Sequence, residues 1–195
     1  MPTQGWNQTL VTQRTAGTLF NTYTTAKTVL NQQDLYSFYA NYFQLGSKLR
    51  IRVVMAVSNR VTGPDTMTFQ VMFQNVIIWT SGAVNLTTTA HTLLPAWLDI
   101  ELTCQLTNTA VGGAVAQFLG VGRLSGLMFS ETSGNADNAF PTTLLVPVTA
   151  PALGTAFDST LSGILDFWVA QSVSNAGNGV KVVDYSVEAL NMPAS

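Results

Sequence analysis

The stretch AWLDIELTCQL, residues 96–106, decides the fold class of this chain. Its apolar side chains recur at every second residue, so one face carries Ala96, Leu98, Ile100, Leu102, Cys104 and Leu106. The opposite face carries Trp97, Asp99, Glu101, Thr103 and Gln105. A period of two is the pattern of a β-strand with one buried face. The stretch therefore predicts a long strand that covers a core.

The same period recurs along much of the chain, in LRIRVVMAVS (49–58), TMTFQVMF (66–73), STLSGILDFWVAQSV (159–173) and VKVVDYSVEAL (180–190). Gln74 and Asn75 lie between two apolar runs and predict a hairpin turn. The prolines of TTLLVPVTAPALG (142–154) predict an edge or crossing segment, because proline cannot donate to a sheet ladder. The glycines of AVAQFLGVGRL (114–124) predict a strand with a bend or bulge.

Two segments, 81–95 and 131–153, are expected to be long connections between strands. The turn SNAGNG (174–179) is expected to join the last two strands, with Asn and Gly supplying backbone conformations that other residues avoid. The pattern predicts an all-β fold, a jelly-roll or β-sandwich of about eight to ten strands. Long crossings favour the jelly roll over an up-and-down barrel. The expected organisation is an extended N-terminal arm, 1–20, and a single jelly-roll domain, 21–195.

Charged residues make up only 9% of the 195 residues, against about 25% in an average protein. A surface with so little charge favours association with neighbours. The net charge is −2 and the eight Lys and Arg are scattered, which argues against nucleic-acid binding. No apolar run is long enough to span a membrane, and the start of the chain lacks the pattern of a secretory signal.

The residue types of catalytic sites are sparse. His91 is the single histidine, and TTTAHTLLP predicts that it is a solvated or locally hydrogen-bonded loop residue. Cys104 is the single cysteine and is expected in the core, so no intrachain disulfide forms. We expect no enzyme, no catalytic residue and no cofactor.

Acidic residues supply the remaining candidates for chemistry. Asp99 and Glu101 have the spacing of a strand face that points away from the core, although paired carboxylates also serve glycosidases. Asp166 and Asp184 lie on the last two predicted strands and could come near each other, although like charges usually avoid close pairing without a cation. The loop SETSGNADNAF is expected to be solvated rather than to bind calcium, and it contains Glu131, Asn135, Asp137 and Asn138. No metal site is expected.

Four residues are candidates for contact with a partner subunit: Trp6, Arg14, Arg50 and Arg52. Trp6 and Arg14 lie in the predicted arm, and Trp6 would bury itself under its own sandwich or on a neighbour. Arg50 and Arg52 point the same way from one strand. They would pair with acidic groups of a partner or remain ordinary surface arginines.

Several ordered blocks of the sequence resemble a family of small virion proteins of tailed bacteriophages. The longest is GTAFDSTLSGILDFWVAQSVSNAGNGVKVVDYSVEALN (154–191), and earlier ones are YFQLGSKLRIRVVMAVSN (42–59), SGAVNLTTTAHT (81–92) and AWLDIELTCQL (96–106). Together they extend over about residues 35–191 and leave the predicted arm outside.

The resemblance implies a jelly-roll virion protein of the head-decoration, cement or minor tail type. The first expectation is a non-enzymatic capsid decoration or cement protein. It would be made in the cytoplasm of the host bacterium and would bind the major capsid protein in the virion as a homotrimer. The alternative is a tail-associated or host-adhesion protein that binds glycans, with Trp79, Trp97 and Trp168 as candidate aromatic platforms, although core packing is expected for each. A third hypothesis is a carbohydrate-active enzyme that uses Asp99 and Glu101.

Overall fold

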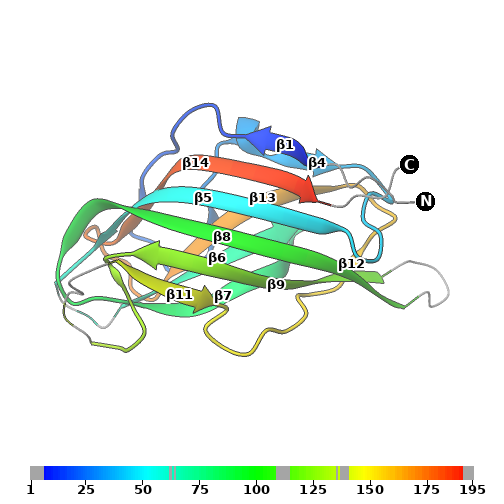
Figure 1. Ribbon diagram of the computed structural model, residues 1–195. Coiled ribbons are helices and arrows are strands. Elements are labelled where there is room, and N and C mark those ends of the chain that lie inside the picture. Colours follow the sequence, from blue (N-terminus) through cyan, green and yellow to red (C-terminus); the bar gives the residue numbers. More distant parts are fainter. Residues whose placement is uncertain are drawn as a thin grey trace.

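Two antiparallel β-sheets lie face to face and enclose one core (Figure 1). The computed structural model describes residues 7–61, 63, 65–108, 115–134, 136 and 141–190, and of residues 106–108 only the backbone. Within these residues the only helical segment is one 3₁₀ turn, η1 (Gln32–Asp34). The predicted all-β sandwich is therefore confirmed. None of the described residues belongs to a helix long and apolar enough to cross a bilayer.

Eight strands form the first sheet: β1 (Gln8–Thr12), β2 (Phe20–Asn21), β5 (Lys48–Asn59), β8 (His91–Asn108), β9 (Val115–Gly126), β11 (Thr142–Val146), β12 (Phe157–Asp158) and β14 (Gly179–Leu190). Six strands form the second: β3 (Lys27–Thr28), β4 (Tyr36–Phe38), β6 (Thr66–Phe73), β7 (Val76–Leu86), β10 (Phe129–Ser130) and β13 (Gly163–Gln171). Across both sheets, five of the strands are only two or three residues long, namely β2, β3, β4, β10 and β12. Such strands are too short to show a period in the sequence. For that reason the expected count of about eight to ten was low.

The order of the strands is that of a jelly roll. The main path of the eight-stranded sheet is β1-β14-β5-β8-β9-β11, and that of the six-stranded sheet is β10-β7-β6-β13-β3, with β4 also on β13. The chain passes repeatedly from one sheet to the other, and its last two long strands insert between early ones. β9 and β11 are added to this arrangement at one edge of the eight-stranded sheet, next to β8. In Figure 1 they are the lower strands of the front layer.

The described part of the predicted arm belongs to this chain's own sheet. β1 pairs with the last strand, with Gln8 opposite Ala189, and the N–H of Gly17 donates to Val182 O at 2.7 Å. The segment is therefore held as an edge strand by packing and backbone hydrogen bonds. Trp6 lies outside the described residues, and the division of the chain at residue 20 stays a prediction.

The last two strands do not form a hairpin, contrary to what the sequence suggested. β13 pairs with β3, β4 and β6, whereas β14 pairs with β1, β2 and β5, so SNAGNG crosses between the two sheets. Asp166 and Asp184 consequently lie on different sheets, so their strands do not bring them together as cross-strand neighbours. Local alternation reports which face of a strand is buried and carries no information on which strand lies beside it.

The expected long connection at 81–95 is also wrong, because most of it is strand. β7 runs to Leu86 and β8 starts at His91, which pairs with Asn59 of β5 and is not a loop residue. The polar residues of this segment interrupt the apolar alternation by which a strand is recognised in the sequence. Ser81, for example, is fully buried, and its hydroxyl accepts the Phe69 N–H at 2.9 Å and donates to Gly82 O at 2.7 Å.

The hairpin at Gln74 and Asn75 is confirmed, since both residues have positive φ (50° and 64°) between β6 and β7. Of the bend or bulge predicted at the β9 glycines, the bulge is absent. Pairing with β8 stays in register from Ala96 opposite Gly126 to Leu106 opposite Ala116. Gly120 is required instead for a close approach, because an added Cβ would meet the side chains of Trp79 and Leu102.

Core residues follow the predicted alternation. On β5 the buried side chains are Leu49, Ile51, Val53, Met55 and Val57, and on β8 they are Ala96, Leu98, Ile100, Leu102 and Cys104. Burial raises the pKa of the Cys104 thiol to about 11, so little thiolate forms at neutral pH. The expectation that this residue fills the core is confirmed.

One end of the sandwich is closed by an aromatic cluster centred on Phe43. This residue belongs to the connection between β4 and β5 and is buried all the same. Its ring centroid lies 4.7 Å from that of Phe38, 5.0 Å from Phe118, 5.4 Å from Phe73 and 5.9 Å from Phe157. The rings come from both sheets, so this connection packs between the sheets and covers the end of the core.

Residues 147–156 form a strap that joins the sheets along one side. The N–H of Val148 donates to Ser81 O, and that of Thr155 to Ile77 O, both at 2.9 Å on β7. On the opposite sheet the N–H of Gly154 donates to Phe118 O at 2.9 Å. β11 and this strap together match the edge or crossing segment that the prolines predicted.

A polar cluster fixes the crossover between β13 and β14. The guanidinium of Arg60 donates to both carboxylate oxygens of Asp65, at 2.6 and 3.0 Å. Asn178 is fully buried, donates to the same carboxylate at 2.7 Å and accepts the Arg60 N–H at 3.0 Å. None of the residues in SNAGNG has a positive φ. The turn is therefore maintained by side-chain hydrogen bonds and close approaches, and the conformational reason that the sequence suggested was wrong.

Asp65→Asn is expected to lower the free energy of unfolding by about 2 kcal/mol at pH 7, since a buried carboxylate loses its charge-assisted hydrogen bonds from Arg60 and Asn178. Hydrogen bonds from Arg60 hold the pKa of Asp65 below its ordinary value, so the folded state favours the carboxylate. This stabilisation is complete above the unfolded pKa of about 3.9 and is lost as the pH falls through the folded pKa. Urea unfolding of both proteins at pH 7 and pH 3 measures the difference, which should shrink at pH 3.

Comparing the two proteins at each pH removes the contribution of other acids. Burial raises the pKa of Asp166, which gives the opposite dependence on pH but acts equally in both proteins. A difference of the same size at pH 3 and pH 7 would contradict a role for the ionised carboxylate of Asp65.

Candidate binding face on the eight-stranded sheet

Charge is concentrated on the outer face of the eight-stranded sheet. The whole chain has 8 basic and 10 acidic residues. Half of them project from this face, namely Lys48, Arg50, Arg52, Asp99, Glu101, Arg123, Lys181, Asp184 and Glu188. The alternation of β5, β8, β9 and β14 produces this concentration, because each strand sends most of its apolar residues into the core. In a chain with so few charges, such a gathering marks the face as chemically distinct.

Opposite charges meet across the strands of this face. Lys48 Nζ lies 2.7 Å from Glu101 Oε1, Arg52 Nε lies 3.3 Å from Asp99 Oδ1, and Arg50 lies 3.8 Å from Glu188 Oε2. The side chains in these pairs are partly exposed, so each pair contributes at most about 1 kcal/mol to stability. The pairs hold the side chains in place more than they hold the fold together.

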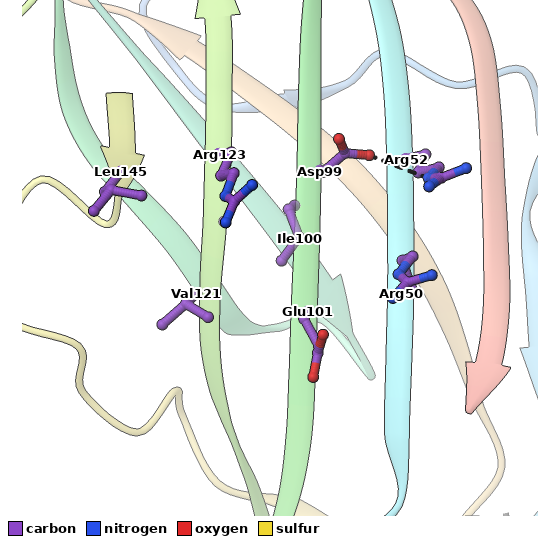
Figure 2. Close-up of a pocket in the computed structure, with 9 residues that line it drawn as sticks. Arg50, Arg52, Asp99, Ile100, Glu101, Val121, Arg123 and Leu145 are labelled. Carbon is purple, nitrogen blue, oxygen red and sulfur yellow. Dashed lines mark ion pairs between the residues drawn. The ribbon is translucent and has the colours of Figure 1, made fainter. Parts of the chain in front are cut away.

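A groove of about 600 Å³ lies across this charged face, over β5, β8, β9 and the end of β11. Figure 2 shows its lining, with the arginines on β5 and β9 and the carboxylates on β8 between them. The lining comprises Arg50, Arg52, Asp99, Ile100, Glu101, Val121, Gly122, Arg123 and Leu145. Val121 and Leu145 form an apolar wall, and Leu145 is 74% exposed.

Trp97 lies on the same outer face, two residues before Asp99 on β8, and its side chain is 46% exposed. The expectation that it packs in the core was therefore wrong, whereas Trp79 is buried as expected. Trp168 is half-buried, and its indole N–H donates to Asp166 Oδ2 at 2.6 Å. The alternation in AWLDIELTCQL already placed Trp97 on the polar face, and that signal outweighs the general tendency of Trp to be buried.

The structure brings together two of the four residues predicted at an interface. Arg50 and Arg52 line the groove side by side on β5, although each approaches an acid of its own chain. Arg14 is exposed but lies outside the groove, and its backbone N–H donates to Asp34 Oδ1 at 3.3 Å. Trp6 is outside the described residues. A partner contact of these four residues stays a prediction.

Sequence reasoning missed Arg123, Val121 and Leu145 as groove residues. They come from β9 and β11, and only the register places Arg123 opposite both Asp99 and Leu145. Alternation alone indicates that Arg123 points outward. Nothing in the local sequence places it beside β8.

The pKa shifts of two candidate acids differ in direction and in cause. The hydrogen bond from Lys48 holds the pKa of Glu101 below its ordinary value, whereas a general acid needs a raised pKa. Burial raises the pKa of Asp166, but that carboxylate already accepts hydrogen bonds from Thr28, Trp168 and the Phe167 N–H. Of the predicted loop acids, Asp137 lies outside the described residues. Among those that are described, no three His, Cys, Asp or Glu side chains group as metal ligands.

No protein-family model and no curated protein matches the chain. Solved structures that resemble it include the CBM2 module of the evolved Dit of Lactobacillus casei BL23 phage J-1, with 10% identity over 83% of this chain and 70% of that one and a TM-score of 0.35. A protein of unknown function from Shewanella oneidensis MR-1 gives 12% identity over 97% and 80%, with a TM-score of 0.34. The structure of infectious bursal disease virus, Gx strain, gives 7% identity over 98% and 37%, with a TM-score of 0.29. At these TM-scores the likenesses carry no argument about function.

Proposed function

We propose that this chain is a non-enzymatic, tail-associated virion protein of a tailed bacteriophage that binds a glycan of the host surface. The observation that supports this proposal is the groove on the outer face of the eight-stranded sheet, with the exposed Trp97 beside it. This role is the alternative that the sequence analysis left open. The geometry of the charged face favours it over the capsid role.

The chemistry of the groove suits a sugar. An exposed indole offers a flat apolar surface for the C–H face of a sugar ring, and its N–H remains a donor. Arginine and carboxylate side chains donate to and accept from hydroxyl groups, and their mutual ion pairs hold them in position before the ligand arrives. Val121 and Leu145 add apolar contact at the β9 and β11 side.

Trp97→Ala is expected to weaken glycan binding about tenfold or more, because exposed aromatic anchors carry a large share of binding energy. A glycan array identifies the ligand for the wild-type protein, and calorimetry with that ligand measures the loss. Circular dichroism should show an unchanged fold, since this side chain lies outside the core.

Tyr39→Ala is the matched control, because it removes another exposed aromatic ring that lies outside the groove lining. It should leave glycan affinity unchanged. If the wild-type protein binds no glycan at millimolar concentration, the proposal fails. Equal losses in the two variants would place the binding site elsewhere.

The second candidate is a capsid decoration or cement protein, and a separate surface favours it. Tyr39, Leu161 and Ile164 are exposed at one end of the sandwich, where the connection after β4 meets the connection before β13. The N–H of Asn41 donates to Ser159 O at 2.8 Å between these connections, and Gly163 pairs with Phe38. Such an apolar end suits a protein partner, and a protein that binds only assembled capsid stabilises it by mass action.

Binding to purified heads tests this second role, and the native mass of the chain tests the homotrimer. Leu161→Asp should abolish head binding while Trp97→Ala leaves it intact. Absence of wild-type binding to expanded heads would remove the capsid role, whatever the glycan result.

A further inference from the structure

We infer that the ligand of this groove is an acidic glycan, and that Arg123 binds its negatively charged group. The inference rests on the proposed glycan-binding function and adds the chemical class of the sugar. The group would be an oxyanion, as in the carboxylate of a uronic acid or the phosphodiester of a polyol phosphate polymer.

Arg123 carries a charge that has no ionic partner among the residues that the structure describes. No acidic oxygen of the described residues lies within 4.0 Å of its guanidinium, although Asp99 is its Cα partner on β8. Figure 2 shows the reason: the Asp99 carboxylate is turned toward Arg52 on the opposite side, and the dashed line joins that pair. The guanidinium of Arg123 is therefore available to bind a ligand in the groove.

The balance of charge in the groove also favours an anionic ligand. Its lining contains three arginines and two carboxylates. Two of these groups have partners outside the lining, since Glu101 is bound at 2.7 Å by Lys48 and Arg50 lies 3.8 Å from Glu188. These two pairs offset each other, so the groove keeps an excess of one positive charge, which an anionic ligand would neutralise.

The surroundings of Arg123 strengthen its attraction for an anion. Val121 precedes it by two residues on the same face of β9, and Leu145 lies directly opposite on β11. A sugar ring that covers these apolar side chains would exclude water from the guanidinium, and charge-assisted hydrogen bonds are stronger where water is excluded. Guanidinium also matches carboxylate and phosphate oxygens with two parallel hydrogen bonds.

The test uses an oligogalacturonate and its methyl ester, which share a sugar chain and differ in charge. Calorimetry at low salt should show that wild-type protein binds the acid at least about tenfold more tightly than the ester. Arg123→Ala should abolish this difference. Arg14→Ala removes the same charge from an exposed position outside the groove and should keep it.

A parallel titration with poly(glycerol phosphate) separates the two sources of negative charge. Preference for either anionic polymer over the neutral ester supports the inference and identifies the oxyanion. Equal affinity for the acid and the ester, together with no binding of the phosphate polymer, overturns the inference but leaves the proposed function intact. Failure of every acidic and neutral glycan to bind rejects both. An acidic preference that survives in Arg123→Ala overturns the assignment of this residue.

Discussion

Phe43→Ala is expected to lower the free energy of unfolding by about 4 kcal/mol. The ring is buried and contacts rings from both sheets, so its removal leaves a cavity at the end of the sandwich. Its neighbours are held by the strands β4, β6 and β9 and can collapse only partly into that space. Guanidinium or urea unfolding followed by tryptophan fluorescence measures the change.

The matched control is Tyr39→Ala, in the same connection but with its ring exposed to solvent. This substitution should change the free energy of unfolding by less than about 0.5 kcal/mol. If Phe43→Ala costs less than about 1 kcal/mol, the connection after β4 does not close the core.

Gly154→Ala is expected to lower the free energy of unfolding by about 3 kcal/mol. A Cβ at this position would overlap the backbone carbonyl of Ile78, which a rotamer change cannot relieve. The strap would have to move away from β7, and the hydrogen bonds of Thr155 to Ile77 O and of Gly154 to Phe118 O would weaken. Unfolding in urea measures the loss, and hydrogen exchange should show faster exchange of the Gly154 and Thr155 amides.

Ala152→Ser provides the comparison, because this residue is exposed on the same strap. It should leave both stability and exchange unchanged. A Gly154→Ala protein as stable as the wild type would mean that the strap is not held in place by its contact with β7.

Much of the fold follows from local sequence. Alternation identified most of the buried residues of β5, β6 and β8, although Ser58 and Met72 are buried outside the alternating pattern. The polar pair Gln74 and Asn75 located a hairpin. These features depend on neighbours along the chain, so a single sequence contains them. The jelly roll was preferred because the crossings looked long, yet one of those crossings, 81–95, proved to be mostly strand.

Features that depend on contacts between distant segments were missed. Asn178 acts through Arg60 and Asp65, and Gly154 through Ile78. Neither contact can be predicted from the residues that neighbour Asn178 or Gly154 along the chain. The groove has the same origin, since it needs four strands in register before Arg123 lies between Asp99 on β8 and Leu145 on β11.

The pairing of β1 with β14 has a mechanical consequence. Gln8 and Ala189 are Cα partners, so the described chain enters and leaves the sandwich at one point. A pulling force applied between these two residues would load the β1–β14 ladder one rung at a time and peel the edge strand away at low force. A pull that runs from this point to a ligand in the groove would instead be shared among the long ladders of β5, β8 and β14, which break together.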